Sequence, residues 1–220
     1  QHFLPAGHPD TPRLWQELCS TLNQKLSRPH FRLLVERIDQ TYGQAFQQHF
    51  GAQKIHHAHA GGLLEHTLGV LNLAWEVARL YTLDTDILVM GVLIHDLGKI
   101  EEFSLNPLPQ TTLPGAMLGH IVLGTLALER MIEGIPDFPE SDRLHLLHLL
   151  VSHHGEREFG APEVPKTAEA FALHFLDNLD SKLQIVREQT AQVTDASAIQ
   201  TEFIPALGRR LICPSQTGRA

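Results

Sequence analysis

The sequence has few cysteines, no long apolar run and no excess of positive charge. Its two cysteines, Cys19 and Cys213, lie far apart and form no CxxC pair, which argues against a disulfide framework and a thiolate zinc site. No uninterrupted apolar run approaches the roughly 18 residues of a membrane span. The formal net charge of −8 argues against a broad basic surface for nucleic acid. We therefore expect a cytoplasmic protein that does not enter a membrane.

Strand-like alternation is also lacking, and apolar residues recur at helical spacing instead. This spacing predicts helices near residues 11–28, 30–50, 62–81, 85–98, 116–132, 140–152 and 167–193. Gly43 is a possible break in the second helix, and Gly98 is expected to end the fourth. The fourth has almost no polar face, so it should lie at the centre of the fold. We predict an all-α bundle of about seven helices, with residues 106–115 as a loop.

Histidine is abundant, with fifteen among 220 residues, and it is the commonest metal ligand. Several histidines and aspartates interrupt the apolar helices, where they are costly to bury without a partner. They are His66, His95, Asp96, His120, His153, His154 and Asp177. A helical bundle can gather ligands from facing helices, and imidazole with carboxylate suits manganese, iron, cobalt, zinc or magnesium. We therefore predict a metal site in the core of the bundle.

Four segments in this order resemble a known family. They are KIHHAHAGGLLEHTLGV (54–70), LIHDLGKIEEF (93–103), VSHHGEREFGAPEVPKTAEAFALHFLDNLDSKL (151–183) and LGRRL (207–211). The chain resembles the HD-domain superfamily of metal-dependent phosphohydrolases and, more narrowly, the YhaM family of 3′ to 5′ exoribonucleases. The resemblance implies a single HD-type bundle with a metal site in its core. We expect N-terminal helices in residues 1–50 that pack on the domain, the HD domain in 51–195 and a C-terminal extension in 196–220.

The same resemblance implies two divalent ions. Manganese is the expected metal, with iron, cobalt, nickel or magnesium as alternatives. The ligands implied for the first ion are His66, His95, Asp96 and Asp177, and those for the second are Asp96 as a bridge, His120, His153 and His154. Whether both adjacent histidines bind is left open, since neighbouring helix positions point about 100° apart. Asp180, one turn after Asp177, could orient a ligand histidine or face solvent.

Several cationic residues near these ligands are candidates for catalysis or substrate binding. Lys99, three residues after Asp96, could stabilise charge on phosphoryl oxygens or bind carbonyls at the end of its helix, and we favour the catalytic role beside Asp96. His57, Arg157 and Lys166 could bind substrate phosphates. The alternative for all three is an ordinary solvated loop.

The leading hypothesis is a metal-dependent phosphodiesterase. It would hydrolyse RNA or single-stranded DNA from the 3′ end with hydroxide activated by two metals. One alternative is an HD phosphohydrolase acting on a small nucleotide, which the net charge of −8 favours. Another is a catalytically inactive metal-binding sensor or scaffold. Members of the resembled family carry an OB-type module before the HD domain. Only fourteen residues precede Trp15, where the resemblance begins, so binding of a long RNA is left open, as is the oligomeric state.

Overall fold

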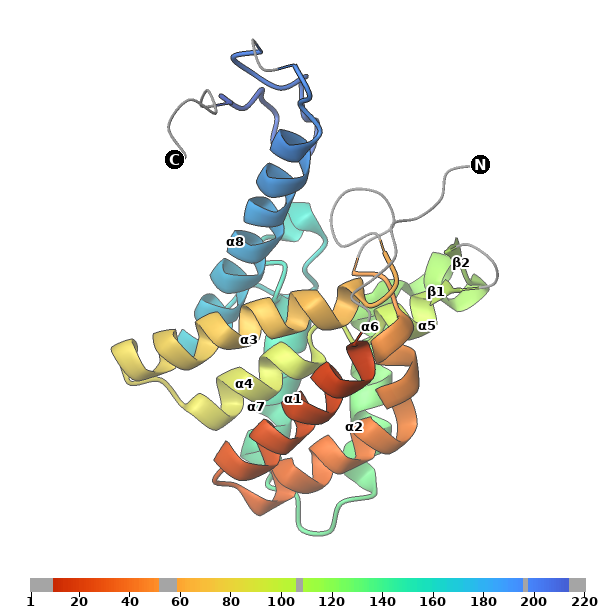
Figure 1. The fold of residues 1–220 in the computed structure, drawn as a ribbon. Helices are drawn as coiled ribbons and strands as arrows, with labels where there is room; N and C mark the ends of the chain where they lie inside the picture. Colours follow the sequence, from red (N-terminus) through yellow and green to blue (C-terminus); the bar gives the residue numbers. More distant parts are fainter. Residues whose placement is uncertain (1–9, 52–58, 106–108, 196–197, 214–220) are drawn as a thin grey trace.

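The computed structural model describes residues 10–51, 59–105, 109–195 and 198–213, and helices dominate it (Figure 1). The long helices in this part of the chain are α1 (Thr11–Lys25), α2 (Pro29–Gln48), α3 (Gly62–Tyr81), α4 (Thr85–Ile94), α6 (Leu113–Glu133), α7 (Glu140–Ser152) and α8 (Ala168–Ala191). The short elements are α5 (Lys99–Glu102), β1 (Phe103–Ser104), β2 (Gln110–Thr111) and the 3-10 turn η1 (Arg157–Phe159). The prediction of an all-α bundle is confirmed.

Helix α4 lies inside the bundle and packs against α3, α7 and α8. Asp84 caps its N-terminus by accepting a hydrogen bond from the Ile87 amide at 3.2 Å. Every residue from Asp86 to Ile94 is buried, and each buried aliphatic side chain stabilises the fold by about 1.5–3 kcal/mol. His95 and Asp96 follow this helix directly, so the apolar core fixes their position.

Two glycines have roles other than those predicted. Helix α2 continues through Gly43, where an added Cβ would lie 2.9 Å from Trp15 Nε1. Glycine therefore leaves room for the hydrogen bond that Trp15 Nε1 donates to Asp39 at 2.6 Å. Helix α4 ends at Ile94, before Gly98, and a Cβ on Gly98 would lie only 1.9 Å from the carbonyl oxygen of His120. Gly98 is thus a point of close contact with α6 rather than a helix stop.

The segment between α5 and α6 contains a small antiparallel ribbon, so residues 110–111 of the predicted loop form a strand. Strand β1 pairs with β2, with Phe103 opposite Thr111. Two-residue strands are too short to give an alternating pattern. Helix α6 begins at Leu113, earlier than predicted, because the Thr112 hydroxyl accepts a hydrogen bond from the Gly115 amide at 2.9 Å. Residues 106–108 of the predicted loop lie outside the described residues.

Helix α6 is bent at Gly119, whose φ of 69° and ψ of 164° are open to glycine and strained for other residues. It packs against α2, α5 and α7. By length and composition α6 meets the requirements for a membrane-spanning helix. Core helices of water-soluble proteins meet the same requirements, so this property is weak evidence for a membrane span.

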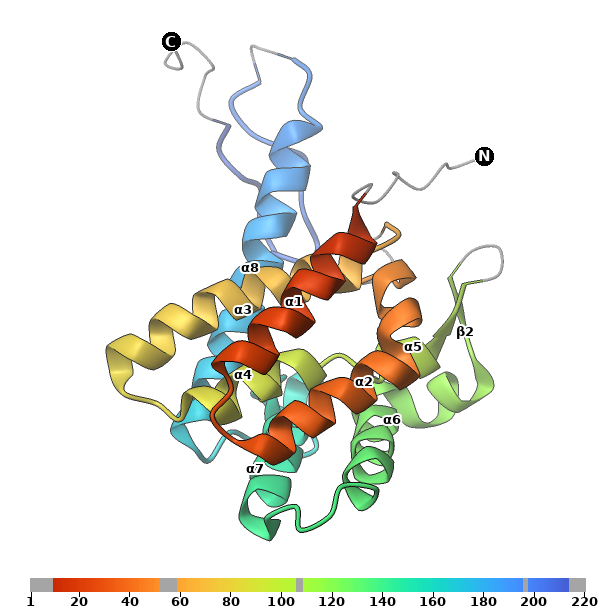
Figure 2. The same ribbon diagram turned by 60° about the horizontal axis from the view of Figure 1, so that its bottom comes forward.

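Helix α8 packs on α3, α4 and α7 and then extends away from the bundle (Figures 1 and 2). The described part of the following segment pairs with itself, with Gln200 opposite Ile212 and Ile204 opposite Arg209. The predicted boundaries of the three parts of the chain, at residues 50 and 195, stay predictions.

Candidate metal centre

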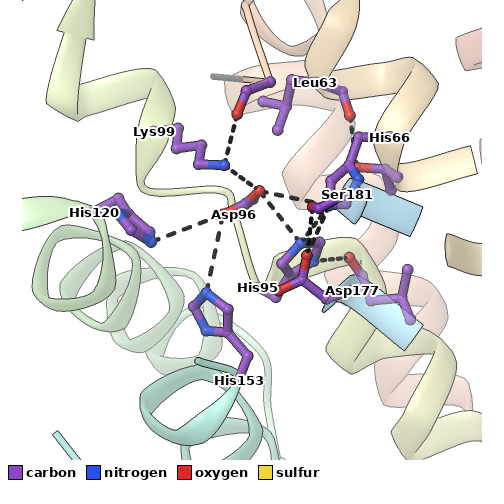
Figure 3. A network of polar contacts seen from close by, with 12 residues as sticks. Leu63, His66, His95, Asp96, Lys99, His120, His153, Asp177 and Ser181 are labelled. Carbon is purple, nitrogen blue, oxygen red and sulfur yellow. Dashed lines mark hydrogen bonds and ion pairs between the residues drawn. The ribbon is translucent and has the colours of Figure 1, made fainter. Parts of the chain in front are cut away.

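Histidine and aspartate side chains from five parts of the chain meet at the C-terminal end of α4 (Figure 3). They come from α3, from the turn after α4, from α6, from the turn after α7 and from α8. The inner group, as we call it, consists of His66, His95, Asp96 and Asp177. The outer group consists of His120, His153 and His154. The possible ligand atoms of His66, His95 and Asp96 lie within 4.8 Å of one another, as do those of the outer group.

In the inner group two imidazole nitrogens face each other, with His66 Nε2 3.2 Å from His95 Nε2. His95 Nδ1 donates to the Val92 carbonyl oxygen at 2.8 Å, so its Nε2 presents a lone pair. Asp96 Oδ2 lies 3.3 Å from His95 Nε2, and Asp177 Oδ1 lies 3.3 Å from His66 Nε2. Lone pairs and carboxylates this close repel one another unless a proton or a cation lies among them.

The protonation of the inner group follows from its charges. Burial lowers the pKa of His66, but contacts with Asp177 and Asp180 outweigh burial and raise it to about 9. Burial acts to raise the pKa of Asp96, but the charge of Lys99 and the contact with His95 outweigh it and hold that pKa well below its usual value. Without a cation, the inner group therefore holds a proton on His66 at neutral pH. A cation in place of this proton would meet two nitrogen and two oxygen donors, a set that suits divalent metals.

The outer group consists of three imidazoles, two of which are oriented by backbone carbonyl oxygens. His153 Nδ1 donates to the Leu150 carbonyl oxygen at 2.7 Å, and His154 Nδ1 donates to that of Phe159 at 2.9 Å. Burial lowers the pKa of both histidines, which keeps them in the neutral form that binds metals. Within the described part of the chain, the buried Nε2 atoms of His120 and His153 have no hydrogen-bond partner. A bound cation would satisfy them.

Asp96 lies between the two groups and directs one oxygen toward each (Figure 3). Its Oδ2 faces the inner group, whereas its Oδ1 lies 3.8 Å from His120 Nε2 and 4.0 Å from His153 Nε2. Lys99 Nζ donates to Asp96 Oδ2 and to the carbonyl oxygen of Gly51, both at 2.6 Å. Lys99 therefore points into the site rather than toward carbonyls at the end of its helix. The position of Asp96, with one oxygen toward each group, suits a carboxylate that bridges two cations.

The adjacent residues His153 and His154 both reach the site because α7 ends at Ser152 and a turn follows. Their ring centroids are 4.4 Å apart. His174 on α8 supports this turn by donating from Nδ1 to the His153 carbonyl oxygen at 2.8 Å. A Cβ on Gly155 would lie 2.3 Å from the His174 ring, so glycine allows this approach.

Asp180 lies behind His66, with its Oδ2 2.8 Å from His66 Nδ1. This contact directs Nε2 of His66 toward the inner group. Gly69 on α3 makes room for it, because an added Cβ would lie 2.5 Å from Asp180 Oδ1. Asp180 is thus placed where an orienting carboxylate is needed.

Of the predicted phosphate-binding residues, the two that the structure describes pair with Glu163. Arg157 Nη2 lies 2.9 Å from Glu163 Oε1, and Lys166 Nζ lies 3.2 Å from Glu163 Oε2. His57 lies outside the described residues. The roles of all three in substrate binding stay predictions.

Glu102, which the sequence reasoning missed, lies close to the outer group. Its Oε2 is 3.3 Å from His120 Nδ1. Glu102 follows Asp96 by six residues, a spacing that matches no ligand motif. The contact arises only because α6 approaches α5 closely at Gly98.

A helical bundle with histidine and aspartate ligands on separate helices is a recognised class of metal-binding domain. The family model described as "HD domain" matches residues 63–182, more than half of the chain. The chain belongs to the HD domain family. Membership implies a site for divalent metal ions, and the inner and outer groups supply suitable residues for it.

Several similar proteins are bacterial enzymes with the name 3′-5′ exoribonuclease YhaM. The chain is 36% identical to the one from Bacillus licheniformis over 188 residues, which are 84% of this chain and 59% of that protein. It is 34% identical to the one from Bacillus subtilis over 198 residues, which are 88% of this chain and 62% of that protein. The chain thus spans about three fifths of these relatives. No solved structure matches it significantly.

Proposed function

We propose that this chain is a metal-dependent phosphodiesterase that hydrolyses RNA or single-stranded DNA from the 3′ end. The proposal depends on one observation. The Asp96 carboxylate lies between two adjacent sets of metal-type ligands, and Lys99 Nζ donates a hydrogen bond to it. The relatives named 3′-5′ exoribonuclease support RNA as the substrate and the 3′ end as the starting point.

Each polar residue of the site has a role in this proposal. Two divalent ions, for which we propose manganese, would activate water and neutralise charge on the phosphoryl oxygens. Asp96 sets the spacing of the two groups, because it directs one oxygen toward each. The Lys99 ammonium lies at the same carboxylate, where it can stabilise negative charge that develops on the phosphoryl group. Asp180 keeps Nε2 of His66 directed into the site.

We propose that substrate binding depends on a few contacts near this site, because a net charge of −8 argues against a broad basic face. We propose His57, Arg157 and Lys166 for phosphate contacts. Arg157 and Lys166 both pair with Glu163, and their side chains are more than half exposed. Exposed ion pairs of this kind are weak, so phosphate oxygens can compete with the Glu163 carboxylate for them.

The test is hydrolysis of an oligoribonucleotide labelled at either end, with Mn²⁺ present. We expect a 3′ label to be released first, and a 5′ label to remain on progressively shorter products. Asp96→Ala should abolish hydrolysis, and Lys99→Met should slow it about 10²-fold. Lys182→Met, at an exposed lysine of α8, is the matched control and should leave the rate unchanged. The proposal is wrong if Asp96→Ala cleaves as fast as the unaltered protein.

Two other results would point to the alternative functions. Turnover of mononucleotides without turnover of oligonucleotides would identify a small-nucleotide phosphohydrolase. Metal binding without hydrolysis of any phosphoester would identify a sensor or scaffold. The cytoplasmic location expected from the sequence stays a prediction.

A further inference from the structure

We infer that Glu102 is a positioning residue that holds His120 in its metal-binding form and thereby controls binding of a cation at the outer group. The inference rests on the proposed two-cation function. It concerns a residue of α5 that contacts no ligand atom of the site itself.

The contact lies on the side of the His120 ring that faces away from Asp96. Glu102 Oε2 is 3.3 Å from His120 Nδ1, and both side chains are only 15% exposed. A neutral imidazole carries one hydrogen, on either Nδ1 or Nε2. A carboxylate beside Nδ1 favours the hydrogen there, which leaves a lone pair on Nε2. That nitrogen is buried, has no hydrogen-bond partner among the described residues and lies 3.8 Å from Asp96 Oδ1.

The other ligand candidates of the outer group have their orientation fixed by the backbone. His153 and His154 donate from Nδ1 to the carbonyl oxygens of Leu150 and Phe159. These carbonyls lie only three and five residues along the chain from the histidines that they orient. The oxygen atom nearest to His120 Nδ1 on this side belongs instead to a side chain from a different element. A single substitution can therefore remove it without changing any candidate ligand.

Helix α5 is held firmly enough to position this carboxylate. The Thr112 amide donates to the Glu102 carbonyl oxygen at 2.9 Å, and the Thr112 hydroxyl donates to that of Glu101 at 2.8 Å. A Cβ on Gly115 would lie 2.3 Å from the Glu102 carbonyl oxygen, so the start of α6 lies directly against α5. Glu102 is thus fixed against the start of α6, and the close contact of Gly98 with the His120 backbone places His120 beside α5.

The bend in α6 also serves this arrangement. Gly119, with its positive φ, immediately precedes His120 and separates the first turns of α6 from the rest of the helix. Helical geometry therefore does not continue through the residue before His120. The orientation of the His120 ring is set by the bend on one side and by Glu102 on the other.

Glu101 is a natural control because it lies on the same short helix and faces elsewhere. Its Oε1 accepts a hydrogen bond from the Tyr42 hydroxyl at 2.7 Å, and its Oε2 lies 3.7 Å from Arg130. A substitution there removes the same charge from α5. It does not touch His120.

The experiment is calorimetric titration of metal-free protein with Mn²⁺, comparing the unaltered chain with Glu102→Met, Glu102→Gln and Glu101→Met. We expect the unaltered protein and Glu101→Met to bind two ions. In Glu102→Met the affinity for one ion should fall about 10–100-fold, whereas the affinity for the other stays unchanged. Glu102→Gln retains an oxygen acceptor and should lie between them.

A second measurement reports the hydrogen position directly. Imidazole NMR signals of the metal-free protein distinguish hydrogen on Nδ1 from hydrogen on Nε2. We expect His120 to carry it on Nδ1 in the unaltered protein and to gain the Nε2 form in Glu102→Met. If Glu102→Met does not fold, Glu102→Gln carries the test, with a smaller shift of the same kind expected.

Unchanged affinity for both ions in Glu102→Met would overturn the inference, even if hydrolysis slowed, because Glu102 would then act on something other than metal binding. A single bound ion in the unaltered protein would overturn the two-cation function instead. In that case the NMR measurement would still test whether Glu102 controls the hydrogen position on His120. Failure of the inference and failure of the two-cation function are therefore distinguishable.

Discussion

The inner and outer groups contain the same imidazole chemistry but differ in the charge around it. Carboxylates of Asp177 and Asp180 contact His66 in the inner group and raise its pKa to about 9. In the outer group burial dominates and lowers the pKa of His153 and His154. The inner group therefore holds a proton when no cation is bound, whereas these two outer histidines stay neutral. Two cations in one site are thus expected to bind with different affinities and a different dependence on pH.

The largest effect is expected at Asp96, because this residue directs one carboxylate oxygen toward the other inner ligands and the other toward the outer group. Asp96→Asn keeps the shape of the side chain but removes its charge, so both cations should bind more weakly. We expect turnover to fall about a thousandfold, which corresponds to about 4 kcal/mol of lost charge stabilisation. Metal content after dialysis should fall for both ions, as measured by mass spectrometry. Glu133→Gln, at the exposed end of α6, is the charge control. Retention of two ions by Asp96→Asn would contradict a bridging role.

The next effect separates the two groups by pH. Below about pH 9, a cation that enters the inner group must displace the proton on His66, so its affinity should fall about tenfold for each pH unit. Between about pH 9 and pH 7 this fall amounts to about a hundredfold. For the outer group, the lowered pKa values of His153 and His154 mean that neither holds a proton to be displaced in this range.

The measurement for this prediction is calorimetry near pH 7.5 in buffers of different ionisation enthalpy, which counts protons released on binding. We expect about one proton for the cation of the inner group and close to none from these outer histidines. Equal proton release for both cations would remove the distinction between the two groups.

Much of the bundle could be predicted from the sequence because local signals and core burial agree. Helix α7 extends over the predicted residues 140–152, and α3 over 62–81. Wherever such a helix is apolar, a histidine or aspartate within it becomes conspicuous, which is how His66, His95 and Asp177 could be proposed. These signals are local, because spacing along one helix reveals which face is buried.

The remaining features depend on contacts between helices, which no local pattern reveals. Gly98 looked like a helix stop, yet its role is to let α5 approach the backbone of α6. Glu102 is marked by no local pattern in the sequence, yet it lies against His120. The second carboxylate on the inner side, Asp180, was easier to propose because it lies one turn from Asp177 on the same helix.

Gly98→Ala should disturb the outer group more than the inner one. The added Cβ would lie 1.9 Å from the His120 carbonyl oxygen, and neither backbone can move away without separating α5 from α6. We expect a loss of about 3 kcal/mol in the free energy of unfolding of the metal-free protein, measured by denaturant titration. The cation of the outer group should bind more weakly, because His120 moves with α6. Weaker binding of the inner cation with unchanged affinity for the outer one would contradict this prediction.

Gly69→Ala is the counterpart for the inner group and should have the smallest effect. Its added Cβ would lie 2.5 Å from Asp180 Oδ1, but a side chain can rotate where a backbone cannot. Alanine within α3 also favours the helix by about 1 kcal/mol, which offsets the crowding, so the free energy of unfolding should change little. Displacement of the Asp180 carboxylate should lower the affinity for the inner cation about fivefold, which is a loss of about 1 kcal/mol in binding free energy. Calorimetric titration of both glycine variants checks the pair, because each should affect a different cation if the two groups are separate binding sites joined only at Asp96.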